Sequence, residues 1–328
     1  MINHLYIIGN GFDLHHEIPS NYKNFREWLN GYQNTDGNYP FKAVVMRLDD
    51  IYGADDVWWW NFENSLGKFD FHRYIDELKT ERYPDIASDD FRDRDRFVMP
   101  DSAQYELSSL YNEMRKAFHE WVKNLPQGKG SKKIHMETQN AFFINFNYTE
   151  TLQRLYNVSE NEIYHIHGKA GRDEPLILGH GRSYKDLEQE TTDNPPISIT
   201  DPNEIQAWYD AHYDPILDET TKCVLDQVAA QRKDVNSILH SAPCRQALNQ
   251  IKNVSDIHIY GLSFSPVDLP YLKTIVANVN ILKTRWEISY FSDDDKQRAD
   301  TFLQKYGIHG NLVNLDDLLL LQQGTLFP

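Results

Sequence analysis

A short apolar segment that runs straight into a glycine turn opens this chain of 328 residues. Leu5-Tyr6-Ile7-Ile8 has the length and composition of a buried strand, and Gly9-Asn10-Gly11 follows it directly. A buried first strand that enters a tight glycine turn is typical of doubly wound sheets, in which a helix comes next. We therefore expect an α/β fold with a Rossmann-like, mostly parallel sheet.

The rest of the chain alternates between helical and strand-like patterns. Apolar spacing predicts helices at residues 20–33, 57–78, 102–125, 269–279 and 293–306. Apolar, β-prone runs predict strands at 141–147, 163–167, 176–178, 256–262 and 286–291. Residues 183–200 are polar and lack a clear period. This order predicts a single domain over residues 1–328, with helical insertions at approximately 20–135 and 183–252.

The composition of the chain indicates which binding partners and which cellular compartment to expect. The chain has 33 Lys and Arg against 49 Asp and Glu, a net charge of −16, which repels nucleic acid and anionic membranes, although such acidity also simply keeps a protein soluble. Its two cysteines form neither a zinc tetrahedron nor a disulfide framework by themselves. No apolar run approaches the roughly 20 residues of a membrane helix. We expect a cytoplasmic protein that contacts neither membrane nor nucleic acid.

The opening turn is the first candidate site. Its two glycines would let the backbone approach a pyrophosphate, whose charge the N–H groups and the helix dipole favour. The third glycine of the Rossmann fingerprint is missing, so a plain strand-to-helix turn is an alternative. Phe12 and Asp13 continue the turn, and an aspartate in a first helical turn usually stabilises the dipole.

Asparagines at the end of the predicted strand 141–147 are the second candidate. Alternation places Asn145 and Asn147 on the same side of that strand. Open α/β sheets bind ligands beyond the carboxyl ends of their strands, which is where these amides fall. Alternatively, Asn147 caps a helix that begins near Thr149.

Histidines form the third candidate. Strand alternation puts His165 and His167 on one face, and Gly168 leaves the second imidazole open to a ligand, where it could transfer a proton near neutral pH. Either histidine could instead hydrogen-bond the backbone in the core. Together with His180 they could also bind a metal, although no carboxylate accompanies them at ligand spacing and no metal is expected.

A late strand end supplies the fourth candidate. In the segment from Ile259 to Asp268 the predicted strand 256–262 opens into Gly261-Leu262-Ser263, which could hold a ribose or phosphate through backbone and hydroxyl contacts. Read alone, this segment is equally a turn followed by a helix cap.

Taken together, these segments resemble the bacterial AbiH-type abortive-infection family, which is associated with defence against phage. The resemblance rests on five segments in order along the chain: residues 7–22 around Gly9-Asn10-Gly11-Phe12-Asp13, Trp60-Asn61-Phe62-Glu63, Asn147-Tyr148-Thr149, His165-x-His167-Gly168 and Gly261-x-Ser263-Phe264. The same order is similar to sirtuin-like NAD-binding domains.

That resemblance implies a role for each segment. The turn of Gly9, Asn10, Gly11, Phe12 and Asp13 would face the pyrophosphate of NAD. Asn147 and His167, with His165 and Gly168 beside them, would face the nicotinamide ribose. Gly261 and Ser263 would hold the distal ribose.

The implied function is antiphage defence by hydrolysis of NAD, as substrate, to nicotinamide and ADP-ribose. His167 would act as base, and Asn147 would hold the water or the ribose in line. Two departures matter: Thr149 stands where an aspartate is usual, and the four-cysteine zinc ribbon of deacetylase sirtuins is missing, which favours an NAD glycohydrolase over a deacylase. The alternatives are a non-catalytic NAD or ADP-ribose sensor or scaffold and a metal-dependent hydrolase. A homo-oligomer or a partner within the defence system is compatible with each of them.

Overall fold

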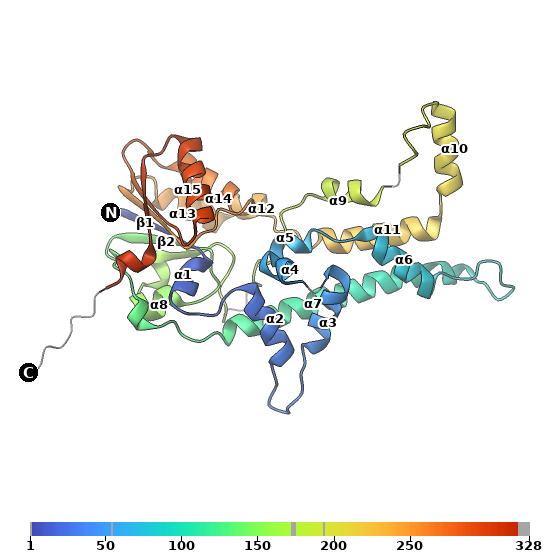
Figure 1. The fold of residues 1–328 in the computed structure, drawn as a ribbon, viewed down its shortest axis with the longest axis horizontal. Helices are drawn as coiled ribbons and strands as arrows, with labels where there is room; N and C mark the ends of the chain where they lie inside the picture. Colours follow the sequence, from blue (N-terminus) through green and yellow to red (C-terminus); the bar gives the residue numbers. More distant parts are fainter. Residues whose placement is uncertain (1, 54, 172–174, 193, 321–328) are drawn as a thin grey trace, which may run out of the picture. The chain divides into compact units, whose positions relative to one another are not determined.

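The computed structural model describes residues 2–53, 55–171, 175–192 and 194–320 (Figure 1). The chain divides into two compact units. The first unit consists of Met1–Trp28, Phe118–Ile177 and Asp234–Pro328, and the second of Leu29–Ala117 and Leu178–Lys233. The two segments of the second unit lie largely within the stretches that the sequence marks as helical insertions.

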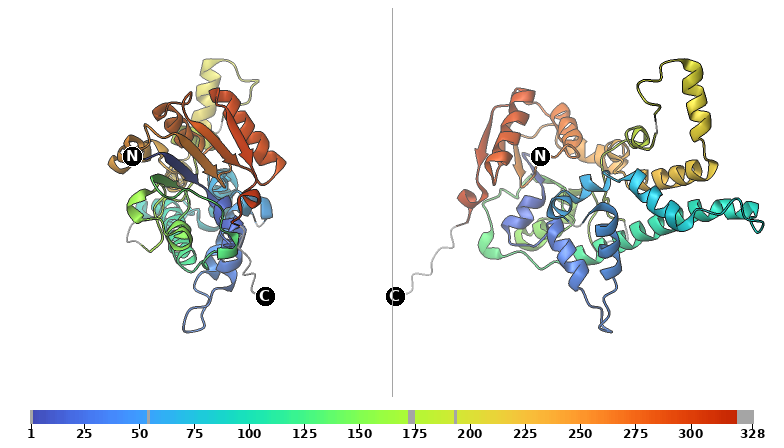
Figure 2. Two further views of the ribbon diagram at one scale, coloured as in Figure 1. Left: turned by 90° about the vertical axis from the view of Figure 1, so that its left-hand side faces the viewer. Right: turned by 45° about the vertical axis from the view of Figure 1, so that its right-hand side comes forward.

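A parallel sheet forms the centre of the first unit. Within the described residues it has six strands: β1 (His4–Ile8), β2 (Ala141–Asn145), β3 (Ile163–His165), β4 (Asp256–Tyr260), β5 (Arg285–Ser289) and β6 (Gly310–Val313). Their order is β3-β2-β1-β4-β5-β6, and every neighbouring pair is parallel, as the arrows in the left view of Figure 2 show. This confirms the α/β, Rossmann-like sheet. The order reverses direction between β1 and β4, which is the switch point where such sheets bind ligands.

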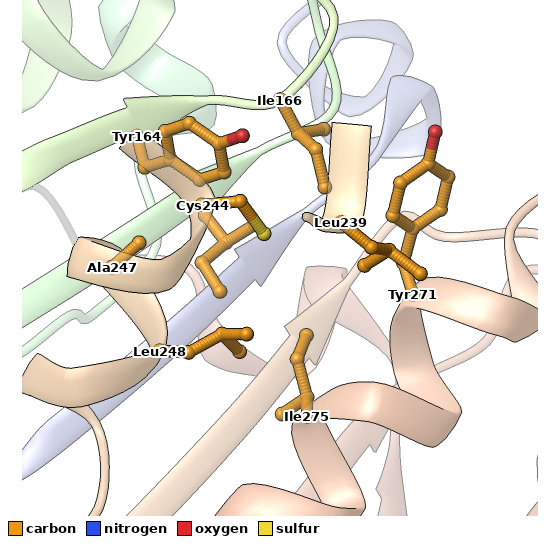
Figure 3. Close-up of a pocket in the computed structure, with 9 residues that line it drawn as sticks. Tyr164, Ile166, Leu239, Cys244, Ala247, Leu248, Tyr271 and Ile275 are labelled. Carbon is orange, nitrogen blue, oxygen red and sulfur yellow. The ribbon is translucent and has the colours of Figure 1, made fainter. Parts of the chain in front are cut away.

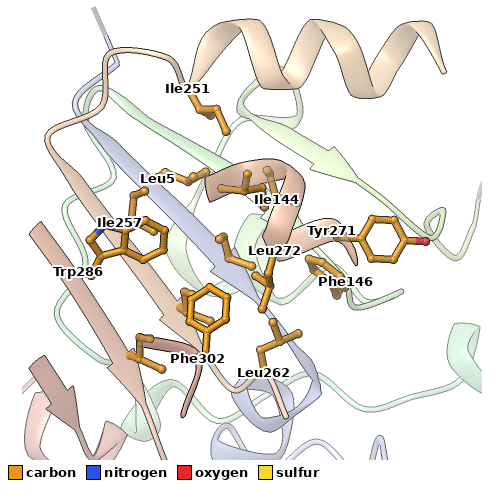
Figure 4. Close-up of a cluster of buried hydrophobic side chains, with 14 of the residues drawn as sticks. Leu5, Ile144, Phe146, Ile251, Ile257, Leu262, Tyr271, Leu272, Trp286 and Phe302 are labelled. Atoms are coloured by element: carbon orange, nitrogen blue, oxygen red, sulfur yellow. The ribbon is translucent and has the colours of Figure 1, made fainter. Parts of the chain in front are cut away.

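Helices cover both faces of this sheet because its central strands are apolar on both sides. One face packs against α13 (Ala242–Gln250), α14 (Leu269–Asn278) and α15 (Asp293–Tyr306) around Ile7, Ile257 and Phe302 (Figure 4). The other face packs against α1 (Asn10–His15), α8 (Thr151–Tyr156) and η4 (Leu315–Leu318) around Tyr6 and Phe143. The first unit also contains η2 (Gly130–Lys132), η3 (Glu160–Glu162) and α12 (Val235–Leu239), and α2 (Tyr22–Gly31) begins in it.

Strand register brings the predicted site segments to one edge of the sheet. Ile8 at the end of β1 lies opposite Asn145 of β2 and Tyr260 of β4, and Asn145 lies opposite His165 of β3. In a parallel sheet all carboxyl ends face the same way. The loops that follow these four strands therefore start at the same level.

The second unit is helical. It contains α3 (Lys42–Tyr52), α4 (Asp56–Trp60), α5 (Phe62–Leu66), α6 (Phe71–Arg82), η1 (Asp93–Phe97), most of α7 (Val98–Lys123), α9 (Tyr184–Thr191), α10 (Pro202–His212) and α11 (Pro215–Ala229). Trp59 and Phe62 are fully buried and stack at 5.2 Å, so these two rings belong to the core of this unit, whereas Trp60 between them in the sequence is exposed.

Several predicted elements need correction. The helix predicted over 57–78 is three helices, α4, α5 and α6, with breaks at Asn61 and at 67–70. Residues 176–178 form no strand, although the Ile177 N–H donates to the carbonyl of His167 at 2.9 Å. The polar stretch 183–200 contains α9, which a capping box of Ser183 and Asp186 begins. None of the helices in the described ranges is long and apolar enough to cross a bilayer.

Candidate functional site

The opening turn closes against the end of β4 rather than standing open. The amide of Gly9 donates to the carbonyl of Tyr260 at 2.9 Å, and the amide of Gly11 donates to the carbonyl of Gly261 at 2.8 Å. A Cβ on Gly9 would lie 2.6 Å from the Gly261 carbonyl oxygen, and one on Gly261 would lie 2.0 Å from the Phe12 nitrogen. These glycines are required because two backbones touch at the switch point.

This contact corrects how the turn could hold a pyrophosphate. The N–H groups of Gly9 and Gly11 are already used within the protein, so they do not form the amide cradle that the sequence predicts. Within the described part of the chain, the Asn10 N–H donates to no backbone carbonyl of the turn. The exposed Asn10 side chain accepts from the Ser20 hydroxyl at 2.6 Å. Of the three amides of the turn, that of Asn10 is the one that makes no such backbone contact within the described residues.

The carboxamide of Asn147 reaches this turn from the neighbouring strand. Its Nδ2 donates to the Gly9 carbonyl at 3.0 Å, and its backbone N–H donates to Asn145 Oδ1 at 3.0 Å. Asn147 is 5% exposed. The alternative in which it caps a helix is wrong, because α8 begins at Thr151 and its N-cap residue is Glu150.

Asp13 is a buried acid beside Asn147. It is 1% exposed, and its carboxylate accepts from the hydroxyls of Thr149 and Thr151, each at 2.6 Å. Burial raises its pKa to about 6, while hydrogen bonds from Thr149, Thr151 and Asn147 act in the opposite direction. Asp13 therefore does not only stabilise the dipole of α1, as an aspartate in a first helical turn usually does, because it also accepts two side-chain hydrogen bonds from the segment after β2. The two threonines Thr149 and Thr151, which come shortly after the strand end, were the sequence feature that could have indicated partners for this carboxylate.

His167 lies against aromatic rings in the turn after β3. It is 4% exposed, and its ring meets those of Phe146 and Tyr271 edge-on, with centroids 5.4 Å and 5.6 Å away. Its Nδ1 lies 3.4 Å from the carbonyl of Phe146, a contact in which the imidazole donates. In that tautomer Nε2 is the basic nitrogen.

His165 faces different partners from His167. Its Nε2 lies 3.5 Å from a Glu160 carboxylate oxygen and 3.3 Å from Gln153 Nε2, while Lys169 pairs with the same glutamate at 3.2 Å. The prediction that the two histidines share a face is wrong, because β3 ends at His165 and strand alternation stops there. Gly168 follows with a φ of 85°, and its left-handed backbone turns the chain away from the strand.

His180 belongs to the second unit, and both of its ring nitrogens are engaged there. Nε2 donates to the Val228 carbonyl at 3.0 Å, and Nδ1 accepts from the Arg182 amide at 3.2 Å. Burial lowers its pKa. Among the described residues, no group of three His, Cys, Asp or Glu is placed to hold a metal ion. This geometry gives the three-histidine metal site no support.

The end of β4 carries the remaining predicted residues. The Gly261 amide donates to Ser289 Oγ of β5 at 2.8 Å, a buried partner that the sequence did not single out. Ser263 is exposed, and its carbonyl accepts from Arg298 Nε at 2.9 Å. The alternative of a turn followed by a helix cap fits this segment, because α14 has Asp268 at its N-cap position.

Two hollows in the structure are lined by other residues. In the first unit, a pocket of about 10 Å³ between Tyr164, Cys244 and Tyr271 is apolar and has room for about one water molecule (Figure 3). In the second unit, an open hollow of about 400 Å³ is lined by Lys68, Phe69, Asp70, Phe71, His72, Arg182 and Glu190. Neither contains a residue that the sequence predicts to contact a nucleotide.

Among the comparisons with known proteins, one found a match. No curated protein and no solved structure matches the chain significantly. The family model described as "Bacteriophage abortive infection AbiH" matches residues 5–290, a span that holds the glycine turn, Asn147, His167 and Gly261. The chain therefore belongs to the AbiH family of bacteriophage abortive-infection proteins and is a protein of antiphage defence.

Proposed function

We propose that this AbiH protein acts in defence as an NAD glycohydrolase, which cuts the bond between nicotinamide and ribose. The observation that carries the proposal is the position of Asn147 and His167. Their side chains follow β2 and β3 at the carboxyl edge of the sheet, and the Asn147 carboxamide touches the turn at the β1/β4 switch point.

The reaction needs few protein groups. A water oxygen bonds to the anomeric carbon of the ribose while the carbon–nitrogen bond breaks, and the bonding pair neutralises the cationic nicotinamide ring as it leaves. The water proton passes to Nε2 of His167, a step that typically contributes about 10²–10⁴-fold. Asn147 holds the water or a ribose hydroxyl in line, where orientation contributes up to about 7–11 kcal/mol. The products are nicotinamide, ADP-ribose and one proton.

Binding of the remote half of NAD would position its reacting end. The pyrophosphate would lie over the Asn10 amide, because the Gly9 and Gly11 amides already donate to backbone carbonyls. The distal ribose would meet the exposed Ser263 near Gly261. Because Asn147 and His167 are 5% and 4% exposed, the nicotinamide ribose would have to enter a recess to reach them.

The test measures NAD and nicotinamide by mass spectrometry, with purified protein and in phage-infected cells that express it. Wild-type protein should lower NAD and release nicotinamide, and Asn147→Ala and His167→Ala should not. Asn253→Ala and His309→Ala change exposed residues of the same types and should behave as wild type. Circular dichroism confirms that each variant is folded. Equal NAD loss in wild type and both site variants would exclude these residues from the chemistry.

Thr149, at the position where the resemblance leads us to expect an aspartate, supports a second candidate, a sensor that binds NAD or ADP-ribose without cleaving it. Titration calorimetry separates the two functions. Tight binding of intact NAD with no product, in infected-cell extract as well as in buffer, would favour the sensor over the enzyme.

A further inference from the structure

His167 lies in a loop that the structure describes in two limbs, residues 165–171 and 175–177. The pairing of β3 with β2 stops at His165, so the sheet does not extend to His167. The two limbs meet where the Ile177 N–H donates to the His167 carbonyl at 2.9 Å. The position of the imidazole therefore depends on what holds these limbs in place.

Tyr148 contacts both limbs. Its carbonyl accepts from the Ala170 N–H at 3.0 Å, and its hydroxyl donates to the Ile177 carbonyl at 2.8 Å. Its ring is inclined by 32° to that of His167, with centroids 6.2 Å apart. The same ring meets Phe118 edge-on, with centroids 5.1 Å apart. Backbone, hydroxyl and ring of one residue thus clamp the loop that carries His167.

The segment that holds this loop also carries the other residue of the proposed chemistry. Tyr148 directly follows Asn147, whose Nδ2 donates to the Gly9 carbonyl at 3.0 Å. The carbonyl of Phe146, one residue before Asn147, lies 3.4 Å from His167 Nδ1. A shift of the loop relative to this segment would therefore change the separation of the carboxamide and the imidazole.

We propose that Tyr148 is a positioning residue, which fixes the His167 imidazole relative to the Asn147 carboxamide by clamping both limbs of the loop to the end of β2. The inference rests on the proposed NAD hydrolysis, in which Asn147 orients the water or the ribose and His167 takes a proton from the water. A base must lie within hydrogen-bond reach of the proton that it takes. A misplacement of about 1 Å can lower a rate by about 10²-fold, so the clamp acts on the rate without touching the substrate.

The hydroxyl and the ring of Tyr148 can be removed in two steps. The contact of its carbonyl with the Ala170 N–H is between backbone atoms and does not depend on the side chain. Tyr148→Phe removes the hydrogen bond to the Ile177 carbonyl and keeps the ring beside His167 and Phe118. Tyr148→Leu removes the hydroxyl and the ring together.

The first experiment measures steady-state NAD hydrolysis by wild type and the two variants. We expect kcat to fall about 10-fold in Tyr148→Phe, which loses one hydrogen bond, and about 10²-fold in Tyr148→Leu. KM should change little, because Tyr148 is not among the residues proposed to bind the nucleotide. Tyr184→Phe is the matched control: it removes a hydroxyl that donates to Asp226 at 3.0 Å in the second unit, and it should leave both parameters unchanged.

Tyr148→Phe changes one atom, so its result decides even if Tyr148→Leu does not fold. Wild-type kcat in folded Tyr148→Phe would overturn the proposal. A raised KM with unchanged kcat would also overturn it, because that result would place Tyr148 in substrate binding.

A spectroscopic measurement reads the position of His167 without the reaction. With labelled histidine and phenylalanine rings, a nuclear Overhauser contact should join the rings of His167 and Phe146, whose centroids lie 5.4 Å apart. This contact should weaken in Tyr148→Phe. The contact between His16 and Phe12, whose ring centroids lie 4.4 Å apart, should persist and show that the rest of the unit is intact.

This measurement separates the clamp from the proposed reaction. If wild type does not hydrolyse NAD but the contact of His167 weakens in Tyr148→Phe, the proposed reaction fails and the positioning role stands. If that contact is the same in wild type and Tyr148→Phe, the positioning role is refuted whatever the activity.

Discussion

Gly261→Ala should be among the most destabilising single-methyl additions in the first unit. Gly261 has a φ of 69°, and a Cβ there would lie 2.0 Å from the Phe12 nitrogen and 2.5 Å from the Gly11 carbonyl carbon. Both neighbours are backbone atoms that form the start of α1, so no side-chain rotation can relieve the overlap. The turn would have to move away from β4 and stretch the hydrogen bond from Gly11 to Gly261.

Two costs add at this position. A left-handed backbone costs an alanine about 1–2 kcal/mol relative to glycine. Forcing an extra methyl group into a packed interior adds about 1–3 kcal/mol. The total of about 2–5 kcal/mol is a large part of the roughly 5–15 kcal/mol that stabilises a typical domain.

Gly307 provides the matched control. It has a φ of 62°, at the end of α15, and a Cβ there would have no atom within 4 Å. Gly307→Ala should therefore cost only the backbone part, about 1–2 kcal/mol. Urea unfolding followed by circular dichroism gives the two free energies, and amide hydrogen exchange in β1 and β4 locates the loss. If Gly261→Ala is no less stable than Gly307→Ala, the close contact at the switch point does not constrain the fold.

Two further predictions concern buried charge. The pKa of Asp13 is raised from 3.8 unfolded to about 6 folded, so its contribution to stability is full below pH 3.8 and is lost as the pH rises through about 6. The difference in free energy of unfolding between wild type and Asp13→Asn, measured with urea, should change by about 3 kcal/mol across that pH range. A difference that stays constant with pH would contradict the raised pKa. Lys233, which is 2% exposed, donates to both Glu63 oxygens at 3.0 Å in the second unit. Because Glu63 keeps some solvent contact, Lys233→Met should lower the free energy of unfolding by about 3 kcal/mol, at the low end for a broken buried pair. Adding Glu63→Leu should restore much of this stability. If the double variant is no more stable than Lys233→Met, the loss comes from packing and not from the unpaired charge.

The local pattern of residues was enough to predict the class of fold. Apolar runs predicted β1, β2, β4 and β5, and apolar spacing predicted α15 with its bounds at 293–306. These elements are encoded within a few residues of chain, by periodicity and by turn-forming side chains. They also sufficed to bring the site segments to one edge, because parallel strands place all of their carboxyl ends together.

Element ends and short interruptions were less predictable. The helix predicted over 57–78 breaks at Asn61 although its apolar spacing continues, and residues 163–167 leave the strand at His165. Apolar spacing shows which positions face the core but does not show where regular backbone structure ends, so it predicted neither break. The orientation of His167 toward Phe146 and Tyr271 follows from that early strand end.

The sequence by itself determined that a glycine turn, two carboxamides and two histidines would lie at the ends of parallel strands. Only the tertiary structure decided what those groups do. It placed the Gly9 and Gly11 amides on the carbonyls of Tyr260 and Gly261, and it brought Asp13 within hydrogen-bond distance of Thr149 and Thr151, more than 130 residues away along the chain. The physical reason is that hydrogen bonds between distant segments depend on where the sheet brings their backbones together, and no local pattern carries that information.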